Sequence, residues 1–264
     1  MTITYVTITY NASAMLQRTL DSVLQQDYPD IVHIIIDGAS TDRTLEMVND
    51  YVAQSNEADN GHKVLVTSEP DHGIYDAMNK GLRSIDGDYV CFLNAGDFLP
   101  APDIVSQIVS AASEQISHLS SLPAVLYGDT DIVDGEGRFL RHRRLSPPEH
   151  LTWKSFRHGM LVCHQAFYVR ADFAIATPYD LRYRYSADVD WCIRIMKAAA
   201  MENVPMLNLY MVVANYTEEG QTTLHHRESL MERYKVMERH YGRICTFLMH
   251  CWFAVRAIVK PNAI

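Results

Sequence analysis

The sequence predicts an α/β protein with a parallel, doubly wound sheet, and two observations support this expectation. Continuous apolar runs, of the kind that parallel sheets bury on both faces, recur along the first hundred residues. Segments with apolar residues at helical spacing lie between these runs, and such alternation implies right-handed βαβ crossovers. We therefore expect a single Rossmann-like sheet that begins at the N-terminus.

The expected elements can be placed in order along the chain. Ser13 is predicted to cap the first helix, and Ser40 or Thr41 the second, because short polar side chains satisfy free N–H groups at a helix start. A third helix is expected from about Ile74 to Ile85. Strands are predicted at residues 2–9, 31–37, 62–69 and 88–94.

The second half mixes strand-like and helical segments, without an internal repeat or an independent linker. A helix is expected from Asp188 to Ala199, and an apolar run follows at 206–214. We predict one domain over residues 1–220, of which 101–220 is an elaborated second half. Residues 221–264 are predicted to form a helical C-terminal segment.

The charges are unevenly distributed. There are 23 Lys and Arg against 32 Asp and Glu, a net charge of −9, which argues against a protein that binds nucleic acid by bulk charge. Residues 1–100 carry −10, residues 101–220 carry −3 and residues 221–264 carry +4. An acidic first part suits metal ions or a solvated surface, and a basic end suits phosphates or an anionic membrane.

The cysteines and the N-terminus bear on the compartment. Five widely spaced cysteines without a C-x-x-C pair argue against a disulfide framework and against a zinc site. The first residues form a β-branched run without a basic n-region or a small-residue cleavage site, so no signal peptide is visible. We expect a cytoplasmic protein.

The C-terminal segment carries an apolar pattern at helical spacing. Its apolar core of roughly thirteen to sixteen residues is shorter than the ~20 needed to span a bilayer. Two interpretations stay open, a helix packed on the domain and an interfacial helix on an anionic membrane. The apolar positions are Ile244, Phe247, Leu248, Cys251, Trp252, Val255 and Ile258, with Arg243, Arg256 and Lys260 nearby.

Polar residues cluster where the predicted strands end, and ligands of such sheets bind at the carboxyl ends of the strands. The first strand is followed by polar residues at 9–11, the second ends at Asp37, and the others are followed by polar residues at 69–72 and 94–97. The glycine loops of P-loop enzymes and of dinucleotide dehydrogenases are absent. Oxygen ligands at strand ends can instead hold a hard divalent cation, which neutralises a diphosphate.

Four stretches resemble inverting glycosyltransferases of glycosyltransferase family 2, including bacterial polysaccharide-biosynthesis members. They are TITYNAS (7–13), LDSVLQQDYPDIVHIIIDGASTDRT (20–44), EPDHGIYDAMNKGLRSIDGDYVCFLNAGD (69–97) and YSADVDWCIRI (185–195). The resemblance implies a GT-A fold, with a nucleotide-sugar-binding half at 1–100 and an acceptor half at 101–220.

The resemblance also implies donor-site roles. Thr9, Tyr10 and Asn11 would lie at the nucleobase, which Asp37 would hydrogen-bond. Asp71 and Asp76 would lie near the nucleotide sugar. Within the stretch NAGD, Asn94 replaces the first carboxylate of an Asp-x-Asp-type motif, Gly96 removes the middle one, and Asp97 remains as the ligand of Mg²⁺ or Mn²⁺.

For the acceptor side, the resemblance implies that Asp188 is the catalytic base, with Asp190 as the rival. Alternatively, Ser186 or Asp188 is an ordinary helix N-cap. His164 and Gln165 resemble a His-Gln pair that precedes the acceptor site, and the alternative for His164 is a structural role. His225 would meet the leaving diphosphate or lie at a solvated helix start.

The resulting hypothesis is a metal-dependent inverting glycosyltransferase. It would move a sugar from a nucleotide donor, a UDP-sugar, to a hydroxyl of a glycan or lipid-linked oligosaccharide, peripherally on the inner face of the cell membrane. The alternatives are a non-catalytic nucleotide-sugar or glycan-binding subunit, and a dinucleotide oxidoreductase, whose glycine fingerprint is absent.

Overall fold

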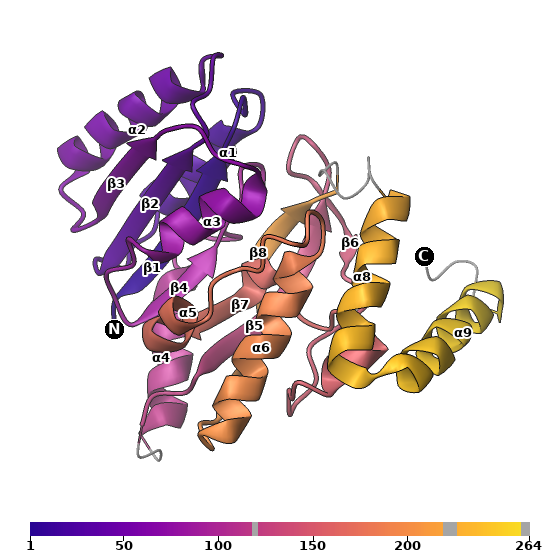
Figure 1. Cartoon of the computed structure of the whole chain (residues 1–264). Coiled ribbons are helices and arrows are strands. Elements are labelled where there is room, and N and C mark those ends of the chain that lie inside the picture. Colours follow the sequence, from indigo (N-terminus) through magenta and orange to yellow (C-terminus); the bar gives the residue numbers. More distant parts are fainter. Residues whose placement is uncertain (118–120, 219–225, 260–264) are drawn as a thin grey trace.

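The computed structural model describes residues 1–117, 121–218 and 226–259 and contains one eight-stranded sheet (Figure 1). The strand order is β3-β2-β1-β4-β7-β5-β6, and β8 pairs with β5. The strands are β1 (Ile3–Thr9), β2 (Ile31–Asp37), β3 (Lys63–Ser68), β4 (Tyr89–Phe92), β5 (Val125–Val133), β6 (Phe139–His142), β7 (Phe167–Arg170) and β8 (Met206–Thr217).

Helices separate and follow these strands. The α-helices are α1 (Leu16–Leu24), α2 (Thr44–Ala58), α3 (Ile74–Leu82), α4 (Ile104–Ile116), α5 (Ala171–Ala176), α6 (Ala187–Met201), α8 (His226–Tyr241) and α9 (Arg243–Val259). Two short 3₁₀ helices are η1 (Ser155–His158) and η2 (His164–Ala166).

The predicted parallel sheet is confirmed for the first hundred residues. β1 pairs in parallel with β2 and with β4, and β2 pairs in parallel with β3. Every residue of β1 and β2 is buried, which explains why both read as unbroken apolar runs. The second half extends this same sheet, because β7 pairs antiparallel with both β4 and β5.

The predicted caps of the first two helices are wrong. The residues that precede α1 and α2 are Met15 and Arg43, and neither caps its helix with a side chain. Asp42 takes the predicted role instead, because its carboxylate accepts the N–H groups of Thr44 at 2.9 Å and of Ser13 at 3.1 Å. Hydrogen bonds from these two residues hold the pKa of Asp42 below its ordinary value.

The last two helices form a separate layer beside the sheet. α8 packs on α6, and α9 contacts α8 and η1 after a sharp turn at Gly242. Figure 1 shows α9 directed away from the sheet. In the part of the chain that the structure describes, no helix is both long and apolar enough to cross a bilayer.

Candidate active site

Both carboxylate oxygens of Asp37, at the end of β2, are occupied by hydrogen bonds from within the protein. Its side chain is fully buried. Its two oxygens accept from the Thr9 hydroxyl (3.1 Å), from the Ser40 backbone N–H (3.0 Å) and hydroxyl (2.5 Å), and from the Ser68 hydroxyl (2.7 Å). Burial alone raises the pKa of this carboxyl, but the hydrogen bonds from Ser40, Ser68 and Thr9 outweigh it and hold the pKa below its ordinary value. Asp37 therefore holds the loop after β2 in place.

Asn11 is similarly engaged. Its backbone is left-handed, with φ of 47°, a conformation that Asn tolerates better than most residues. Its Oδ1 accepts the N–H groups of Thr41 at 2.9 Å and Asp42 at 3.3 Å, and its own N–H donates to the Ser40 hydroxyl. Of the three residues predicted at the nucleobase, Thr9 is buried, whereas Tyr10 and Asn11 reach solvent, and Tyr10 has 65% of its surface exposed.

Asp71 lies against the glycine that follows Asp37. A Cβ placed on Gly38 would be 2.5 Å from Asp71 Oδ2 and 3.3 Å from the Tyr10 ring, so the Asp71 carboxylate takes the space of a side chain at position 38. Its Oδ1 accepts the Gly73 N–H at 2.8 Å, and among the described residues no donor reaches Oδ2. Asp71 and Tyr10 thus form the open part of this edge.

Asp76 lies in the first turn of α3. Its Oδ2 accepts the backbone N–H of His72 at 3.0 Å, which fastens the loop that leads into the helix. A carboxylate at this end of a helix is also favoured by the helix dipole. In this structure Asp76 therefore shapes the loop that carries Asp71.

Asp97, the predicted metal ligand, is buried beneath the loop after β4. Its oxygens accept the Gln165 side-chain N–H at 2.8 Å and the Thr217 backbone N–H at 3.1 Å. Burial raises its pKa to about 6, although both hydrogen bonds act in the opposite direction. The Thr19 hydroxyl bonds the Asp97 carbonyl at 2.7 Å and accepts the N–H of Gly96, so β8, η2 and α1 all hold this loop.

Asn94, at the other end of that loop, contacts His164. Its Nδ2 lies 3.0 Å from His164 Nε2, so the amide donates, the ring nitrogen accepts, and the imidazole proton belongs on Nδ1. That Nδ1 faces Asp188 Oδ2 at 3.6 Å. Asn94 Oδ1 is buried and has no hydrogen-bond partner among the described residues. The structure thus brings together Asn94, His164 and Asp188, which are far apart in the sequence.

Asp188 is the second residue of α6, and two side chains orient its carboxylate. The Tyr75 hydroxyl donates to Oδ1 at 3.1 Å, and His164 faces Oδ2. Burial raises the pKa of Asp188, but the His164 contact and the charge of Arg233 more than offset this and keep the pKa below its ordinary value. With 17% of its side chain exposed, Asp188 is an ionised carboxylate that a small hydroxyl can still reach.

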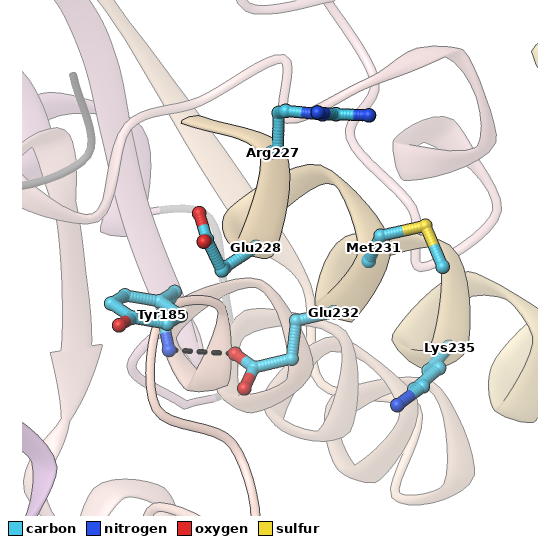
Figure 2. A pocket seen from close by; sticks show the side chains of 6 residues that line it. All are labelled: Tyr185, Arg227, Glu228, Met231, Glu232 and Lys235. Atoms are coloured by element: carbon cyan, nitrogen blue, oxygen red, sulfur yellow. Dashed lines mark hydrogen bonds between the residues drawn. The ribbon is translucent and has the colours of Figure 1, made fainter. Parts of the chain in front are cut away.

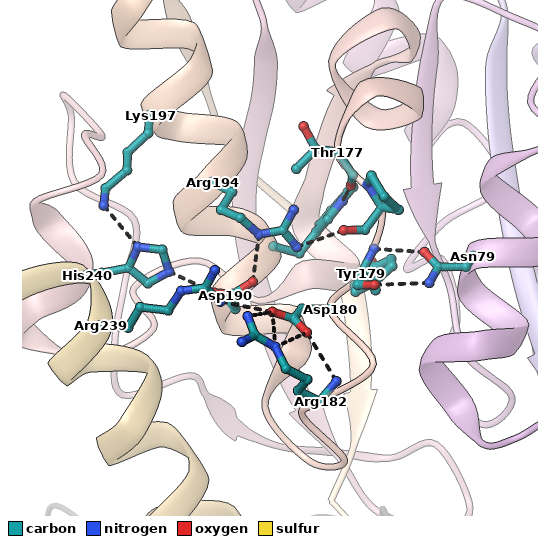
Figure 3. Close-up of polar contacts among 12 residues, drawn as sticks. Asn79, Thr177, Tyr179, Asp180, Arg182, Asp190, Arg194, Lys197, Arg239 and His240 are labelled. Carbon is teal, nitrogen blue, oxygen red and sulfur yellow. Dashed lines mark hydrogen bonds and ion pairs between the residues drawn. The ribbon is translucent and has the colours of Figure 1, made fainter.

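Sequence reasoning missed Tyr75, although it lies inside the stretch GIYDAMN. Its ring stacks on Tyr179 at 5.5 Å between centroids, and Tyr179 stacks on Trp191 at 4.8 Å. Asn79 of α3 then bonds both backbone groups of Tyr179, as Figure 3 shows (Figure 3). The aromatic stack and this clamp join α3 to α6, which fixes the Tyr75 hydroxyl beside Asp188.

Asp190, the alternative candidate for the base, does not point toward Tyr75 and His164 as Asp188 does. Its side chain is fully buried between α6 and α8, where it meets Arg194 at 2.6 Å and His240 at 2.8 Å (Figure 3). Burial raises its pKa, and these two partners more than offset that effect and leave the pKa below its ordinary value. With its oxygens engaged by Arg194 and His240, Asp190 is a structural carboxylate that joins two helices.

The start of α6 is capped from α8. Ser186 precedes the helix but makes no side-chain cap, so the N-cap interpretation of its hydroxyl is wrong. Instead, Glu232 accepts the N–H groups of Arg184 at 2.7 Å, Tyr185 at 2.6 Å and Ser186 at 2.8 Å. Figure 2 shows the Tyr185 contact in an open pocket on α8, which includes none of the predicted site residues (Figure 2).

The remaining predictions concern His225 and a cation. His225 lies outside the described residues. Within the described ranges, no group of three or more His, Cys, Asp or Glu side chains could hold a metal ion. The loop at 94–97 offers one carboxylate and one amide oxygen, and Mg²⁺ in enzymes often takes one or two carboxylates with substrate phosphates and water. The residues fit a cation that the donor's diphosphate carries, and do not fit one held by the protein alone.

The mixed α/β fold, with its parallel β3-β2-β1-β4 part and polar edge, is that of GT-A glycosyltransferases. The family model for "Glycosyl transferase family 2" matches residues 4–173. The chain belongs to glycosyltransferase family 2 and is a glycosyltransferase, as the sequence predicted.

Two curated relatives resemble most of the chain. It is 32% identical over 261 residues to the "PGL/p-HBAD biosynthesis glycosyltransferase" of Mycobacterium bovis (strain BCG / Pasteur 1173P2), covering 97% of this chain and 93% of that relative. It is 31% identical over 212 residues to the "Amylovoran biosynthesis glycosyltransferase AmsB" of Erwinia amylovora, covering 77% of this chain and 67% of AmsB.

Solved structures show the same fold. S. aureus TarS 1–349 in complex with UDP-GlcNAc matches with a TM-score of 0.68 at 18% identity, covering 90% of this chain and 65% of that one. The mannosyltransferase PcManGT from Pyrobaculum calidifontis, in complex with GDP-Man and Mn²⁺, matches with a TM-score of 0.61 at 16% identity, covering 90% and 64%. The chain thus spans about two thirds of the length of these two proteins, and at such identities the likeness concerns the fold.

Proposed function

We propose that this glycosyltransferase transfers a sugar with inversion from a nucleotide-sugar donor to a hydroxyl of a glycan or lipid-linked acceptor, and that Asp188 is the general base. The observation that supports this most is the placement of Asp188. Tyr75 and His164 orient its carboxylate, and its lowered pKa keeps it ionised. The relatives named for amylovoran and PGL/p-HBAD biosynthesis support an acceptor of this class.

Inversion requires one base. The acceptor hydroxyl attacks the anomeric carbon from the face opposite the leaving nucleoside diphosphate, and Asp188 takes the hydroxyl proton as the new bond forms. Tyr75 holds one carboxylate oxygen, and His164, whose Nε2 accepts from Asn94, presents its Nδ1 proton to the other. Both are positioning residues, because they act on the substrate through Asp188.

For the donor we propose a uridine nucleotide, with a different division of roles from that implied by the resemblance. Asp37 has no free acceptor, whereas Asp71 Oδ2 lies beside the exposed Tyr10 ring. Tyr10 would stack on the base, and Asp71 would accept its N3–H group, which uracil carries and cytosine lacks. Asn94, in place of the first carboxylate of the Asp-x-Asp-type motif, would contact the ribose, and Thr9, Asn11 and Asp76 would support the loops around the nucleotide. TarS in complex with UDP-GlcNAc supports this donor class.

We propose Mg²⁺ or Mn²⁺ as the cofactor, held by Asp97 through the diphosphate of the bound donor. When bound, the cation would neutralise charge on the leaving diphosphate. Asp97 would have to exchange one internal hydrogen bond for the metal, because Gln165 and Thr217 now occupy both oxygens. PcManGT with GDP-Man and Mn²⁺ supports metal use in this fold. We place the reaction at the inner face of the cell membrane, with His225 near the diphosphate and Gln165 holding Asp97.

The test is release of nucleoside diphosphate from a panel of UDP-, GDP- and CDP-sugars, with Mn²⁺ or with a chelator. Turnover that is fastest with a UDP-sugar and lost with the chelator supports the proposal. Binding of UDP-sugars without any turnover, in the presence of glycan and lipid-linked acceptors, would indicate a non-catalytic binding subunit instead. Equal turnover with the chelator would overturn the metal assignment alone.

A further inference from the structure

The apolar side of α9 faces outward. Its exposed side chains recur at intervals of three and four residues, so they form one stripe along the helix, hereafter the α9 stripe. The members with their exposed fractions are Ile244 (79%), Phe247 (60%), Leu248 (60%), Trp252 (55%) and Val255 (51%), and Cys251 between them is also exposed. The stripe covers about 16 Å of helix.

The opposite side of α9 is packed on the protein and contains apolar as well as polar residues, namely Cys245, Thr246, Met249, His250 and Phe253. Thr246 is fully buried, and its hydroxyl has no hydrogen-bond partner among the described residues. His250 donates from Nδ1 to the Thr246 carbonyl at 2.9 Å, and its ring lies against Tyr234 of α8 at 4.7 Å between centroids. The side-chain packing of α9 on α8 thus uses these residues and leaves the stripe uncovered.

The exposed side of α9 is therefore not the polar side that is expected for a helix on a water-soluble surface. Such helices turn their apolar stripe toward the core and their polar residues toward solvent, because burial of apolar surface is favourable and a buried hydroxyl without a partner is costly. A continuous apolar surface of this kind marks an interaction site. The stripe therefore needs an apolar partner outside the described chain.

The positive charge of the C-terminal segment favours an anionic partner for the α9 stripe. Residues 221–264 carry +4, and no Asp or Glu follows Glu238, whereas Arg243 begins α9 and the sequence places Arg256 and Lys260 after the stripe. A second copy docked symmetrically on the same stripe would bring two positively charged segments together. An anionic bilayer presents the opposite charge together with an apolar interior.

The dimensions agree with a helix that lies in the membrane surface. No described helix is long and apolar enough to span a bilayer. Aromatic residues such as Phe247 and Trp252 are favoured at the boundary between headgroups and acyl chains. A short helix with an apolar stripe and basic flanks has the properties of an interfacial anchor.

We propose that α9 is a membrane-binding helix that inserts the α9 stripe into the surface of an anionic lipid bilayer. The proposal agrees with a lipid-linked acceptor but does not depend on it, because it rests on the outward stripe and the basic flanks. Leu248 and Trp252, one turn apart, lie in the middle of the stripe and have large exposed side chains.

The experiment is flotation of the full chain with vesicles of phosphatidylcholine, with or without phosphatidylglycerol. We expect binding to vesicles that contain phosphatidylglycerol, and weaker binding at high salt. The double variant Leu248→Ser, Trp252→Ser should bind at least about tenfold more weakly, since it removes two large apolar side chains from the bilayer. Because both side chains are exposed, its melting temperature should stay close to that of the original protein.

The matched control is Leu140→Ser, which removes an exposed apolar side chain (47%) on β6, away from α9. Its vesicle binding should be unchanged. Vesicle binding that is absent, or equal for the double variant and the original chain, would overturn the proposal. Concentration-dependent dimerisation that the double variant abolishes would assign the stripe to a second copy instead. UDP binding, measured in parallel, reports on the donor site and separates failure of this proposal from failure of the proposed function.

Discussion

The edge of the sheet near β1 and β2 and the helix α9 treat their side chains in opposite ways. At the edge, polar groups such as Asp37 and Asn11 accept hydrogen bonds from neighbouring loop residues, so most of the site is preformed. On α9, apolar groups such as Phe247 and Trp252 turn outward and find no cover. The polar groups at the sheet edge thus find their hydrogen-bond partners within the chain, whereas the apolar side chains of α9 require a surface outside it.

The same contrast recurs within α6, between two carboxylates separated by one residue. Asp188 faces Tyr75 and His164 at the site, while Asp190 faces Arg194 and His240 in the interior. Two helical positions differ by about 200° around the axis, which is why neighbours in sequence serve different regions.

Asp190→Asn tests how much the contacts of Asp190 with Arg194 and His240 contribute to the stability of the fold. It removes the buried anion that the half-buried Arg194 and the buried His240 contact, and breaking a buried pair costs about 3–5 kcal/mol of stability. The free energy of unfolding, measured in urea, should fall by that amount. The matched control is Asp172→Asn, at a more exposed ion pair with Arg170, which should change stability by about 0–1 kcal/mol. Equal losses for the two variants would contradict this account of α6.

The pH dependence of folding reports on His33, in the core of β2. His33 is fully buried between the hydroxyls of Thr7 (2.9 Å) and Tyr51 (2.7 Å), and burial lowers its pKa from 6.5 to about 3. Between these values the unfolded chain binds a proton that the folded chain does not. The contribution of His33 to stability is therefore complete above pH 6.5 and declines as the pH falls toward 3, by up to about 1.4 kcal/mol per pH unit.

Urea unfolding of the original chain and of His33→Gln, at a series of pH values between 7 and 4, measures this contribution. The variant should be less stable at pH 7 because it lacks the native ring contacts, and its stability should depend less steeply on pH. Identical pH slopes for the two proteins would show that His33 is not the titrating group.

Asp71→Asn tests the open part of the sheet edge. Asparagine at this position can donate to N3 of cytosine and no longer offers a charged acceptor to the N3–H of uracil. UDP affinity should fall by about tenfold, equivalent to about 1.4 kcal/mol, and CDP should gain relative to UDP. The neighbouring control Glu69→Gln changes a half-exposed carboxylate that pairs with Lys80, and it should leave both affinities unchanged. Calorimetry that finds UDP affinity unaltered by Asp71→Asn would remove Asp71 from base recognition.

The parallel order of the first four strands was predictable mainly because β1, β2 and β4 are buried throughout and therefore form continuous apolar runs, whereas β3 at the edge of the sheet is mostly exposed. The helix that carries Asp188 was predictable as well, because its pattern lies within one continuous segment of the sequence. The partners of the site residues were not, because they depend on long-range contacts. Tyr75 reaches Asp188 across 113 residues, and Thr217 reaches Asp97 across 120.

The hydrogen bonds that occupy the Asp37 carboxylate could not be predicted either, because one of them depends on a long-range contact. Ser40 is near in sequence and reads as a helix cap, while Ser68 comes from a strand that only the tertiary fold brings close. The outward direction of the α9 stripe was equally hidden. Helical spacing shows that the apolar residues share a side, and only the packing of Thr246 and His250 shows which way that side faces.

The central claim is that Asp188 removes the proton from the acceptor, and turnover of Asp188→Asn tests it most directly. The variant keeps the size of the side chain and the Tyr75 contact, so its melting temperature and UDP affinity should stay near those of the original chain. Sugar transfer should fall by about 10²–10⁴-fold, the usual contribution of a general base. Transfer within about threefold of the original rate, by a variant that folds and binds UDP normally, would contradict the account.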